Sequence, residues 1–417
     1  MNILFKNAKI IDKNSPFHLQ TKDILIEKGI ITKIDKNLKA TKDTKLIDLE
    51  NLHISNGWFD TSVSLGEPGY EERETIENGL KTAANSGFTA IAMNPNTFPV
   101  IDNKSAVEFI VNKTHKNIVD VYPIANFSKE GKGENMAELY DMKNSGAIAF
   151  GDYNSSIKNV NLFKIGLQYV QNFEGLLINF PQDNSFKGFV NEGENSTKIG
   201  LKGMPSLAEE LQIARDLFVL EYTGGKLHIP SISTKKSVKL ISDAKKKGLN
   251  VTCSVTAHHL VLTDDEILNF NTNCKVLPPL RTKSDIKALQ NAVKNGVIDA
   301  ITSDHNPIDI EHKKVAFENA KYGTIGLESL FGAINSVLDL ETTITALTFS
   351  PRKVFGLEQS TIDINEKANL TFFDPECNFD FTEDLISSTS KNALFLNKKL
   401  KGKVYGIYNA KKLHLHS

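Results

Sequence analysis

Short apolar runs alternate with amphipathic segments through the middle of this 417-residue chain, from about residue 52 to residue 357. Runs such as TAIAMN and GAIAFGD are each followed by a segment whose apolar positions have helical spacing. Apolar strands that alternate with helices indicate a parallel sheet. About eight such units over roughly 300 residues predict an α/β fold, a (β/α)8 barrel, with a doubly wound open sheet as the alternative. No GxGxxG motif follows the first strand, which argues against a dinucleotide-binding fold.

The longest predicted helix covers the sequence SLAEELQIARDLFVLEYTG, which directly follows GLKGMP. Ser206 precedes its first apolar residue, and Glu209 stands three positions later. This spacing is typical of a capping box, in which the two side chains satisfy free backbone N–H groups at the start of a helix.

Both ends of the chain alternate apolar and polar residues, as half-buried strands do. NILFKNAKII and DILIEKGIITKI, with a turn at Lys28-Gly29, lie near the N-terminus, and ANLTFFD and KGKVYGIYNAKKLHLH lie near the C-terminus. We therefore predict that residues 1–54 and 358–417 form one composite β-sandwich domain and that residues 55–357 form the barrel. The functional site of such a barrel lies at the C-terminal ends of its strands.

Composition narrows the classes of function. The 49 basic and 50 acidic residues leave a net charge of −1, so we expect neither nucleic acid nor an anionic membrane as a partner. The N-terminal sequence lacks the pattern of a signal peptide, and no apolar run approaches the roughly 20 residues of a membrane span. Three widely spaced cysteines argue against a disulfide framework and fit a reducing cytoplasm; they are Cys253, Cys274 and Cys377.

Several segments resemble, in order, those of dihydroorotases, which are cyclic amidohydrolases of pyrimidine biosynthesis. The matching segments are EPGYEERETIENGLKTAANSGFTAIAMNPNTFPVID, GAIAFGD, GLKGMPSLAEELQIARD, HIPSIST, VTCSVTAHHLVLTDDE, PPLR and ITSDHNP with TIGLESLF. The resemblance covers nearly the whole chain, and the terminal segments are similar to the family's split β-sandwich. It implies a hydrolase in which two divalent ions, typically zinc, activate a bridging water that attacks a ring amide.

The metal-binding histidines that the resemblance implies are replaced in this sequence. The His-x-His motif of the first strand falls on Ser62 and Ser64, and two later ligand histidines fall on Phe180 and Ser231. A neutral hydroxyl is a poor zinc ligand, and a phenyl ring has no donor atom. The loss of four imidazoles implies a protein that binds no stoichiometric zinc.

Other functional positions of the family are partly preserved. In AFGDYN, one acid of a family pair remains as Asp152 and the other is Tyr153, and the sequence leaves open which position would hold the metal. Asn96 matches a substrate-binding asparagine. Asp304 matches the acid that would contact the metal and act as general base, so it is a vestigial catalytic candidate.

Substrate recognition also differs from the family. Gly66 stands where the family has the arginine that would bind the substrate carboxylate. Leu277 stands where it has the asparagine before PPLR, and Ile308 where it has a late histidine. Glycine offers neither the charge nor the two-pronged hydrogen bonding of a guanidinium group. These changes weaken the expected binding of an anionic substrate.

Structural roles compete with functional roles for several residues. His228 is expected to be a packed, hydrogen-bonded strand histidine, and the family carries the His258-His259 pair without using it as ligands. Asp304 could instead anchor its loop, and Asn96 could stabilise the turn in NPNT.

Three functions remain open. The first is a non-catalytic dihydroorotase-like protein that serves as a structural partner of aspartate carbamoyltransferase, as degenerate members of the family do, with a homodimer also possible. The second is an active dihydroorotase or other cyclic amidohydrolase with a rebuilt site. The third is a small-molecule binding module. The rebuilt site would draw on Asp60, Asp152, Asp183, His228, His258 and Asp304.

Overall fold

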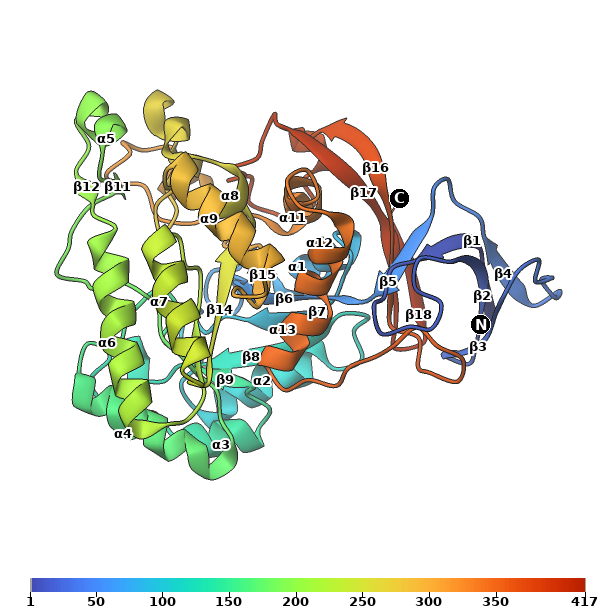
Figure 1. Cartoon of the computed structure of the whole chain (residues 1–417), viewed down its shortest axis with the longest axis horizontal. Helices are drawn as coiled ribbons and strands as arrows, with labels where there is room; N and C mark the ends of the chain where they lie inside the picture. The colour runs from blue at the N-terminus through green and yellow to red at the C-terminus, as the bar shows by residue number, and fades with distance from the viewer. Residues whose placement is uncertain (1, 417) are drawn as a thin grey trace.

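Eight parallel strands form a closed barrel in the computed structural model, which describes residues 2–416 (Figure 1). The barrel closes where Val63, at the end of the first strand, bridges His305 after the last, and the backbone N–H of Ser64 donates to the His305 carbonyl at 2.7 Å. The predicted barrel is confirmed and the open sheet is excluded. Its strands are β6 (Trp58–Val63), β7 (Phe88–Met93), β8 (Asp120–Ala125), β9 (Ala149–Phe150), β10 (Leu177–Ile178), β13 (Leu227–Ile229), β14 (Val251–Thr256) and β15 (Ala300–Thr302).

Helices connect the strands and cover the outside of the barrel. The principal helices are α1 (Ile76–Asn85), α2 (Lys104–Thr114), α3 (Leu139–Asn144), α4 (Val160–Val170), α6 (Leu207–Thr223), α7 (Lys235–Lys246), α8 (Ala257–Val261), α9 (Lys283–Lys294), α11 (Leu327–Ile334), α12 (Leu340–Leu347) and α13 (Phe349–Val354). The loops add α5 (Glu194–Ile199), α10 (Ile310–Lys313) and the paired strands β11 (Val190–Asn191) and β12 (Gly203–Met204). Among residues 2–416, no helix has both the length and the apolar character needed to cross a membrane.

Two apolar clusters support the barrel. The larger one lies between the strands and the surrounding helices. A smaller one fills the barrel centre, where Phe59 meets Phe355 edge-on at a ring distance of 5.6 Å. Ile124 and Ile178 belong to this central cluster and also form the floor of a cavity at the strand ends. The centre of the barrel is therefore packed, and only its C-terminal mouth is available for a site.

The predicted capping box of α6 is wrong. Ser206 has helical backbone angles and makes no capping hydrogen bond. The Glu209 carboxylate instead accepts from the backbone N–H groups of Ser233 at 2.9 Å and Thr234 at 3.1 Å, just before α7. Glu209 is only 2% exposed, so its charge needs tertiary donors. The side chain therefore joins α6 to the start of α7 and leaves its own helix uncapped.

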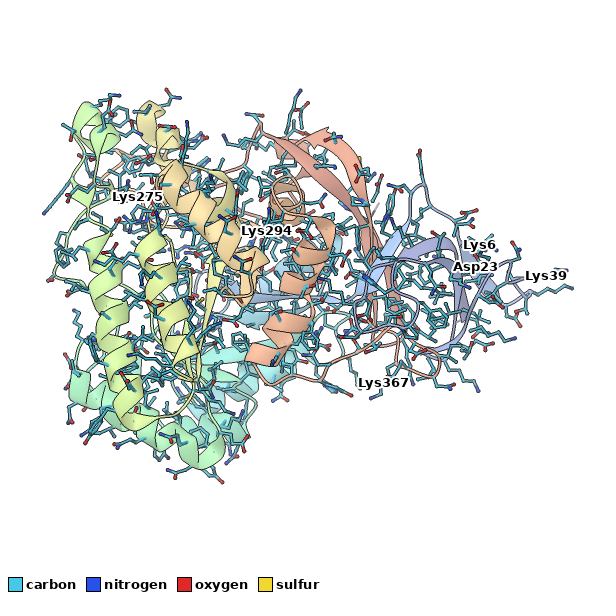
Figure 2. All side chains as sticks on the ribbon, viewed as in Figure 1. Lys6, Asp23, Lys39, Lys275, Lys294 and Lys367 are labelled. Atoms are coloured by element: carbon cyan, nitrogen blue, oxygen red, sulfur yellow. The ribbon has the colours of Figure 1, made fainter. Side chains whose placement is uncertain are left out.

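The two ends of the chain form one mixed sheet, as their shared pattern predicted. β5 pairs with β16 in antiparallel register, with Asn56 opposite Leu370, and so joins the N-terminal to the C-terminal strands. Figure 2 shows Lys6 beside Asp23, an ion pair that links β1 to β2. The strands are β1 (Asn2–Ile10), β2 (Thr21–Glu27), β3 (Ile30–Asp35), β4 (Thr44–Ile47), β5 (His53–Asn56), β16 (Leu370–Asp380), β17 (Lys399–Asn409) and β18 (Lys412–Leu415). The sandwich arrangement and the domain boundaries stay predictions.

Candidate functional site

A small cavity lies at the C-terminal ends of the barrel strands. Its walls include residues from five strand ends, namely Ser62, Tyr153, Phe180, Ser231 and Asp304. The cavity has a volume of about 30 Å³, enough for about two water molecules. Pockets that bind small molecules usually have volumes of about 300 Å³ or more, roughly ten times as large. The fold thus brings together Ser62, Phe180, Ser231 and Asp304, which the sequence singled out, around a small volume, whereas Ser64 and Asn96 do not line it.

Hydrogen bonds link the polar side chains at the strand ends to one another. Asp304 Oδ1 accepts from Ser62 Oγ at 3.0 Å and from the Tyr153 hydroxyl at 3.3 Å. Asn94 Nδ2 donates to Ser62 Oγ at 3.0 Å and to Ser64 Oγ at 3.1 Å. Ser62 Oγ, Ser64 Oγ and Asp304 Oδ1 therefore already have partners, whereas the buried Thr61 hydroxyl, which also lines the cavity, has none among the described residues. Sequence reasoning missed Asn94, although its place directly after β7 could have indicated it.

The electrostatics of the cavity depend mainly on Asp304. Burial raises the pKa of the Asp304 carboxyl to about 6, although the hydroxyl groups of Ser62 and Tyr153 favour the ionised form. The negative charge of Asp60 raises the pKa of Asp304 further. Burial also raises the pKa of the Tyr153 hydroxyl well above its usual value. At neutral pH the cavity therefore holds one carboxylate and a neutral phenol.

Three of the strand ends have a backbone conformation that side chains other than glycine rarely adopt. The φ angles are +50° at Tyr153, +51° at Ser231 and +47° at Asp304. Each costs on the order of 1–3 kcal/mol and persists only where the surrounding fold enforces it. Such strain collects at active and ligand-binding sites, so it supports the barrel mouth as the candidate functional site.

Asp60 closes the barrel and does not line the cavity. Its Oδ1 accepts from the Thr302 hydroxyl and from the backbone N–H of Ser62 at 3.1 Å. Its Oδ2 accepts from the backbone N–H of Ser303 at 3.0 Å. The carboxyl is fully buried, and burial raises its pKa. Asp60 therefore joins the first and last strands of the barrel, which is a structural role.

The remaining acids proposed for a rebuilt site point elsewhere. Asp152 accepts from the Ser128 backbone N–H at 3.0 Å and from the Ser128 hydroxyl at 2.5 Å, away from the cavity. Asp183 accepts from the backbone N–H of Ser185 at 2.9 Å in its own loop. Of the pair that the sequence left open, Tyr153 is thus the residue that faces the cavity.

His228 is hydrogen-bonded within the fold through both ring nitrogens, as predicted. That ring bonds Thr252 Oγ1 at 2.9 Å and Ser254 Oγ at 3.1 Å, and burial lowers its pKa to about 3. His259 bonds the Thr256 hydroxyl and the Pro279 carbonyl. His258 Nε2 has no hydrogen-bond partner among the described residues and does not line the cavity. Of the six side chains proposed for a rebuilt site, only His228 and Asp304 line the cavity.

The side chains at the barrel mouth do not fit a binuclear metal centre. Within residues 2–416, no group of three or more His, Cys, Asp or Glu side chains is arranged to hold a metal ion. A structural or catalytic zinc needs three or four such ligands. The cavity offers one carboxylate, Asp304, and one histidine, His228, whose ring nitrogens already have partners. The absence of bound zinc stays a prediction.

The loop after β6 is tightly packed at Gly66, the position that the resemblance aligns with the family's substrate arginine. A Cβ atom at Gly66 would overlap the carbonyl oxygen of Tyr70 and lie 2.9 Å from that of Glu74. The Tyr70 N–H donates to the Gly66 carbonyl at 2.8 Å, which holds the loop in this form. No larger side chain fits here without a backbone shift. Asn96 does not line the cavity, and its buried Oδ1 has no partner among the described residues; its substrate role stays a prediction.

A buried lysine holds the loop that carries Leu277. Figure 2 labels Lys275, whose Nζ donates to the carbonyl oxygens of Phe317 and Glu318, each at 2.8 Å. The ammonium group also lies 4.8 Å from the ring centre of Phe189, and burial lowers its pKa to about 8. Leu277 does not line the cavity, and neither does the buried Ile308.

The match of residues 195–404 to the amidohydrolase family places the chain in that class, and solved hydantoinases share its fold. The L-hydantoinase (dihydropyrimidinase) from Arthrobacter aurescens has the same fold, with a TM-score of 0.85 and 20% identity over 99% of this chain and 95% of that one. The D-hydantoinase (dihydropyrimidinase) from Thermus sp. has a TM-score of 0.82 and 21% identity over 99% and 95% of the two chains.

Sequence relatives define the family more closely. Residues 53–237 match the dihydro-orotase-like family. The dihydroorotase of Geotalea daltonii is 36% identical over 423 residues, covering 99% of both chains, and that of Geobacter metallireducens is 37% identical over 410 residues, covering 96% of both. The chain belongs to the dihydroorotase family.

Proposed function

We propose that this chain is a non-catalytic member of the dihydroorotase family. The observation that supports it is the barrel mouth, where Ser62, Phe180 and Ser231 surround a cavity of about 30 Å³ whose hydroxyl and carboxyl groups bond one another. Zinc lowers the pKa of a bound water from about 15.7 to about 7. Without ligands for a metal, the site has no comparable means to generate a hydroxide nucleophile at neutral pH.

A role as a structural partner of another protein would explain why the barrel fold is intact although its mouth lacks metal ligands. By resemblance to degenerate members of the family, we propose aspartate carbamoyltransferase as the partner, in a cytoplasmic assembly of pyrimidine biosynthesis. We also propose that residues 1–54 and 358–417 form one composite β-sandwich domain. The outer helices and loops would then carry the function, and the strand ends would only support the fold.

Metal content and turnover test the loss of catalysis. The chain and the Geotalea daltonii dihydroorotase, as a reference, would be purified, incubated with zinc and dialysed. We expect the chain to contain well under one zinc per molecule and to hydrolyse no dihydroorotate at concentrations where the reference is active. One or two zinc ions per chain together with turnover would overturn the proposal.

Association with aspartate carbamoyltransferase is a separate measurement. The enzyme from the same organism would be mixed with the chain at tens of micromolar and followed by sedimentation velocity. We expect a complex that persists in Asp304→Ala, because that side chain faces the cavity at the strand ends and is itself buried. Independent sedimentation of the two proteins would contradict the partnership and leave the catalytic question unaffected.

An active enzyme is the second candidate, and one observation favours it. The Asp304 carboxyl, with a pKa raised by burial to about 6, faces the cavity beside the hydroxyl groups of Ser62 and Tyr153, so it could exchange a proton near neutral pH. Complementation of a strain that lacks dihydroorotase tests this candidate. Growth that is lost in Asp304→Ala but retained in Asp183→Ala, a loop control, would favour activity over the structural role.

A further inference from the structure

A second pocket lies between the barrel helices α1 and α11 and the terminal strands β16 and β17 (Figure 1). Its volume is about 250 Å³, against about 30 Å³ for the cavity at the strand ends. An apolar cavity of about 150 Å³ can hold benzene, so this pocket has room for a ring with one substituent. Its apolar wall is formed by Phe331, Phe379, Phe381, Leu385 and Val404.

Three polar side chains on the wall of this pocket already have partners. Asn85 Nδ2 donates to the Ser387 hydroxyl at 3.1 Å, and Asn85 Oδ1 bonds the His414 ring at 2.7 Å. The Ser86 hydroxyl donates to the carbonyl oxygen of Thr82 at 2.7 Å. These side chains are satisfied within the chain, so none of them needs a ligand.

The carboxylate of Glu328, on the first turn of α11, is different. Its Oε1 accepts from the backbone N–H of Ser388 at 3.0 Å and from the Ser388 hydroxyl at 2.8 Å. Its Oε2 is buried and has no hydrogen-bond partner among the described residues. Burial raises the pKa of Glu328, although the bonds from Ser388 and the charge of Lys391 favour the ionised form. A buried acceptor without a donor is unfavourable, so a donor that enters the pocket beside this carboxylate would be stabilised.

We propose that this pocket binds a small aromatic cation, such as an amidine, with its ring against the phenylalanines of the wall and its N–H groups toward Glu328. Pockets for small molecules are mostly apolar and carry a few polar groups that orient the ligand, which is the composition found here. Aromatic rings pack favourably against one another, and a hydrogen bond between two charged groups is stronger than one between neutral groups. The proposal does not depend on whether the barrel mouth is catalytic.

The basic side chains near the pocket do not exclude a cation. Lys403 lines the pocket, but it is exposed, so solvent screens its charge. Lys391 directs its Nζ to two backbone carbonyl oxygens, at 2.7 and 2.9 Å. Desolvation lowers the pKa of the His416 ring, which is therefore neutral at pH 7. Glu328 is thus the acid that a cation in this pocket would meet.

Calorimetric titration of the full chain with benzamidine, a phenyl ring that carries a cationic amidine, tests the proposal. We expect one site with a dissociation constant of about 1 mM or below, the order expected for a ligand of this size. Toluene lacks the donor and guanidinium lacks the ring, so each should bind at least about tenfold more weakly. No saturable binding of benzamidine, or equally tight binding of either control compound, would overturn the proposal.

Two variants locate the site. Glu328→Gln keeps the shape of the side chain but removes its charge, so it should weaken benzamidine binding by at least about tenfold. Val404→Phe fills the pocket and should abolish binding, which keeps the test valid if Glu328→Gln does not fold. Val315→Phe, at an exposed valine outside the pocket, is the matched control and should bind as the wild type does. Unchanged affinity in Glu328→Gln and Val404→Phe, or a loss only in Asp304→Asn, would place the ligand elsewhere and overturn the proposal.

The thiol of Cys377 reports occupancy of the pocket directly. It lines the pocket and is the least buried of the three cysteines, so N-ethylmaleimide should label it before the other two. Saturating benzamidine should slow this labelling severalfold, because the ligand would cover the thiol, and the protection should be lost in Glu328→Gln. A labelling rate that does not change in a chain that binds benzamidine would contradict the proposed site.

Discussion

The mouth of the barrel and the outer face of α6 depart from the usual distribution of polar and apolar groups in opposite directions. Barrel enzymes keep an open, polar mouth and a charged outer surface. Here the mouth is reduced to about 30 Å³ and its polar side chains bond one another, whereas Phe218 and Tyr222 on α6 are 73% and 79% exposed. The polar groups of the mouth are thus largely engaged with one another, whereas two aromatic side chains of α6 are exposed to other molecules.

The two regions also differ in what a change there should cost. In the mouth, Ser62, Asn94, Tyr153 and Asp304 bond one another, and removing one of them leaves a buried group unsatisfied at about 1–3 kcal/mol. On α6, an exposed phenylalanine forgoes the roughly 1.5–3 kcal/mol that full burial would provide. The mouth should thus be sensitive to substitution, whereas the exposed side chains of α6 should not.

The largest effect is expected at Asp60. Asp60→Ala should lower the free energy of unfolding by about 3 kcal/mol or more, because the Thr302 hydroxyl and the backbone N–H groups of Ser62 and Ser303 all lose their acceptor. Urea denaturation measures this change. Asp183→Ala, in an exposed loop, is the control and should change stability by less than about 1 kcal/mol. Similar values for both variants would mean that Asp60 does not hold the barrel closed.

A smaller, pH-dependent effect is expected at Asp304. The pKa of its carboxyl is about 6 in the folded chain against 3.8 for the ordinary group, so the folded state holds this proton more tightly. Stability contributed by the protonated group is therefore lost as the pH rises from about 4 to about 6. Asp304→Asn cannot ionise, so it should match the wild type near pH 4 and exceed its stability by about 2 kcal/mol at pH 7.

Urea denaturation of both proteins at several pH values measures this difference. Other carboxyl groups titrate in the same range, but their contributions cancel when the wild type and the variant are compared. A difference in stability that does not vary between pH 4 and pH 7 would show that the carboxyl is not perturbed by burial in the mouth.

Local patterns were sufficient to predict the barrel and most of the positions that meet at its mouth. Ser62, Phe180 and Ser231 could be identified because strand ends follow from apolar runs, and the family resemblance aligned them. The direction of each side chain could not be identified. Whether Asp152 or Tyr153 faces the cavity depends on a φ of +50° at Tyr153, which tertiary contacts impose and no local pattern encodes.

Tertiary contacts also explain the other differences. Glu209 satisfies the pattern of a capping box, but the N–H groups before α7 bind its buried carboxylate instead. The tight packing of the loop at Gly66 depends on the approach of the Tyr70 carbonyl, again a contact between backbone segments. Residue types identify candidates for a site, whereas the space around them decides whether a site is open.

The smallest effect is expected at Phe218. Phe218→Ala should change the free energy of unfolding by less than about 0.5 kcal/mol, because the ring is mostly exposed. Phe163→Ala, which removes a fully buried ring from α4, should cost about 3–5 kcal/mol under the same conditions.

Urea denaturation of the wild type and the two variants measures both changes. A loss of about 2 kcal/mol or more in Phe218→Ala, by the usual measure for a packed ring, would show that Phe218 packs within its own chain. The contrast between a mouth whose polar groups bond one another and an exposed helix surface would then no longer hold.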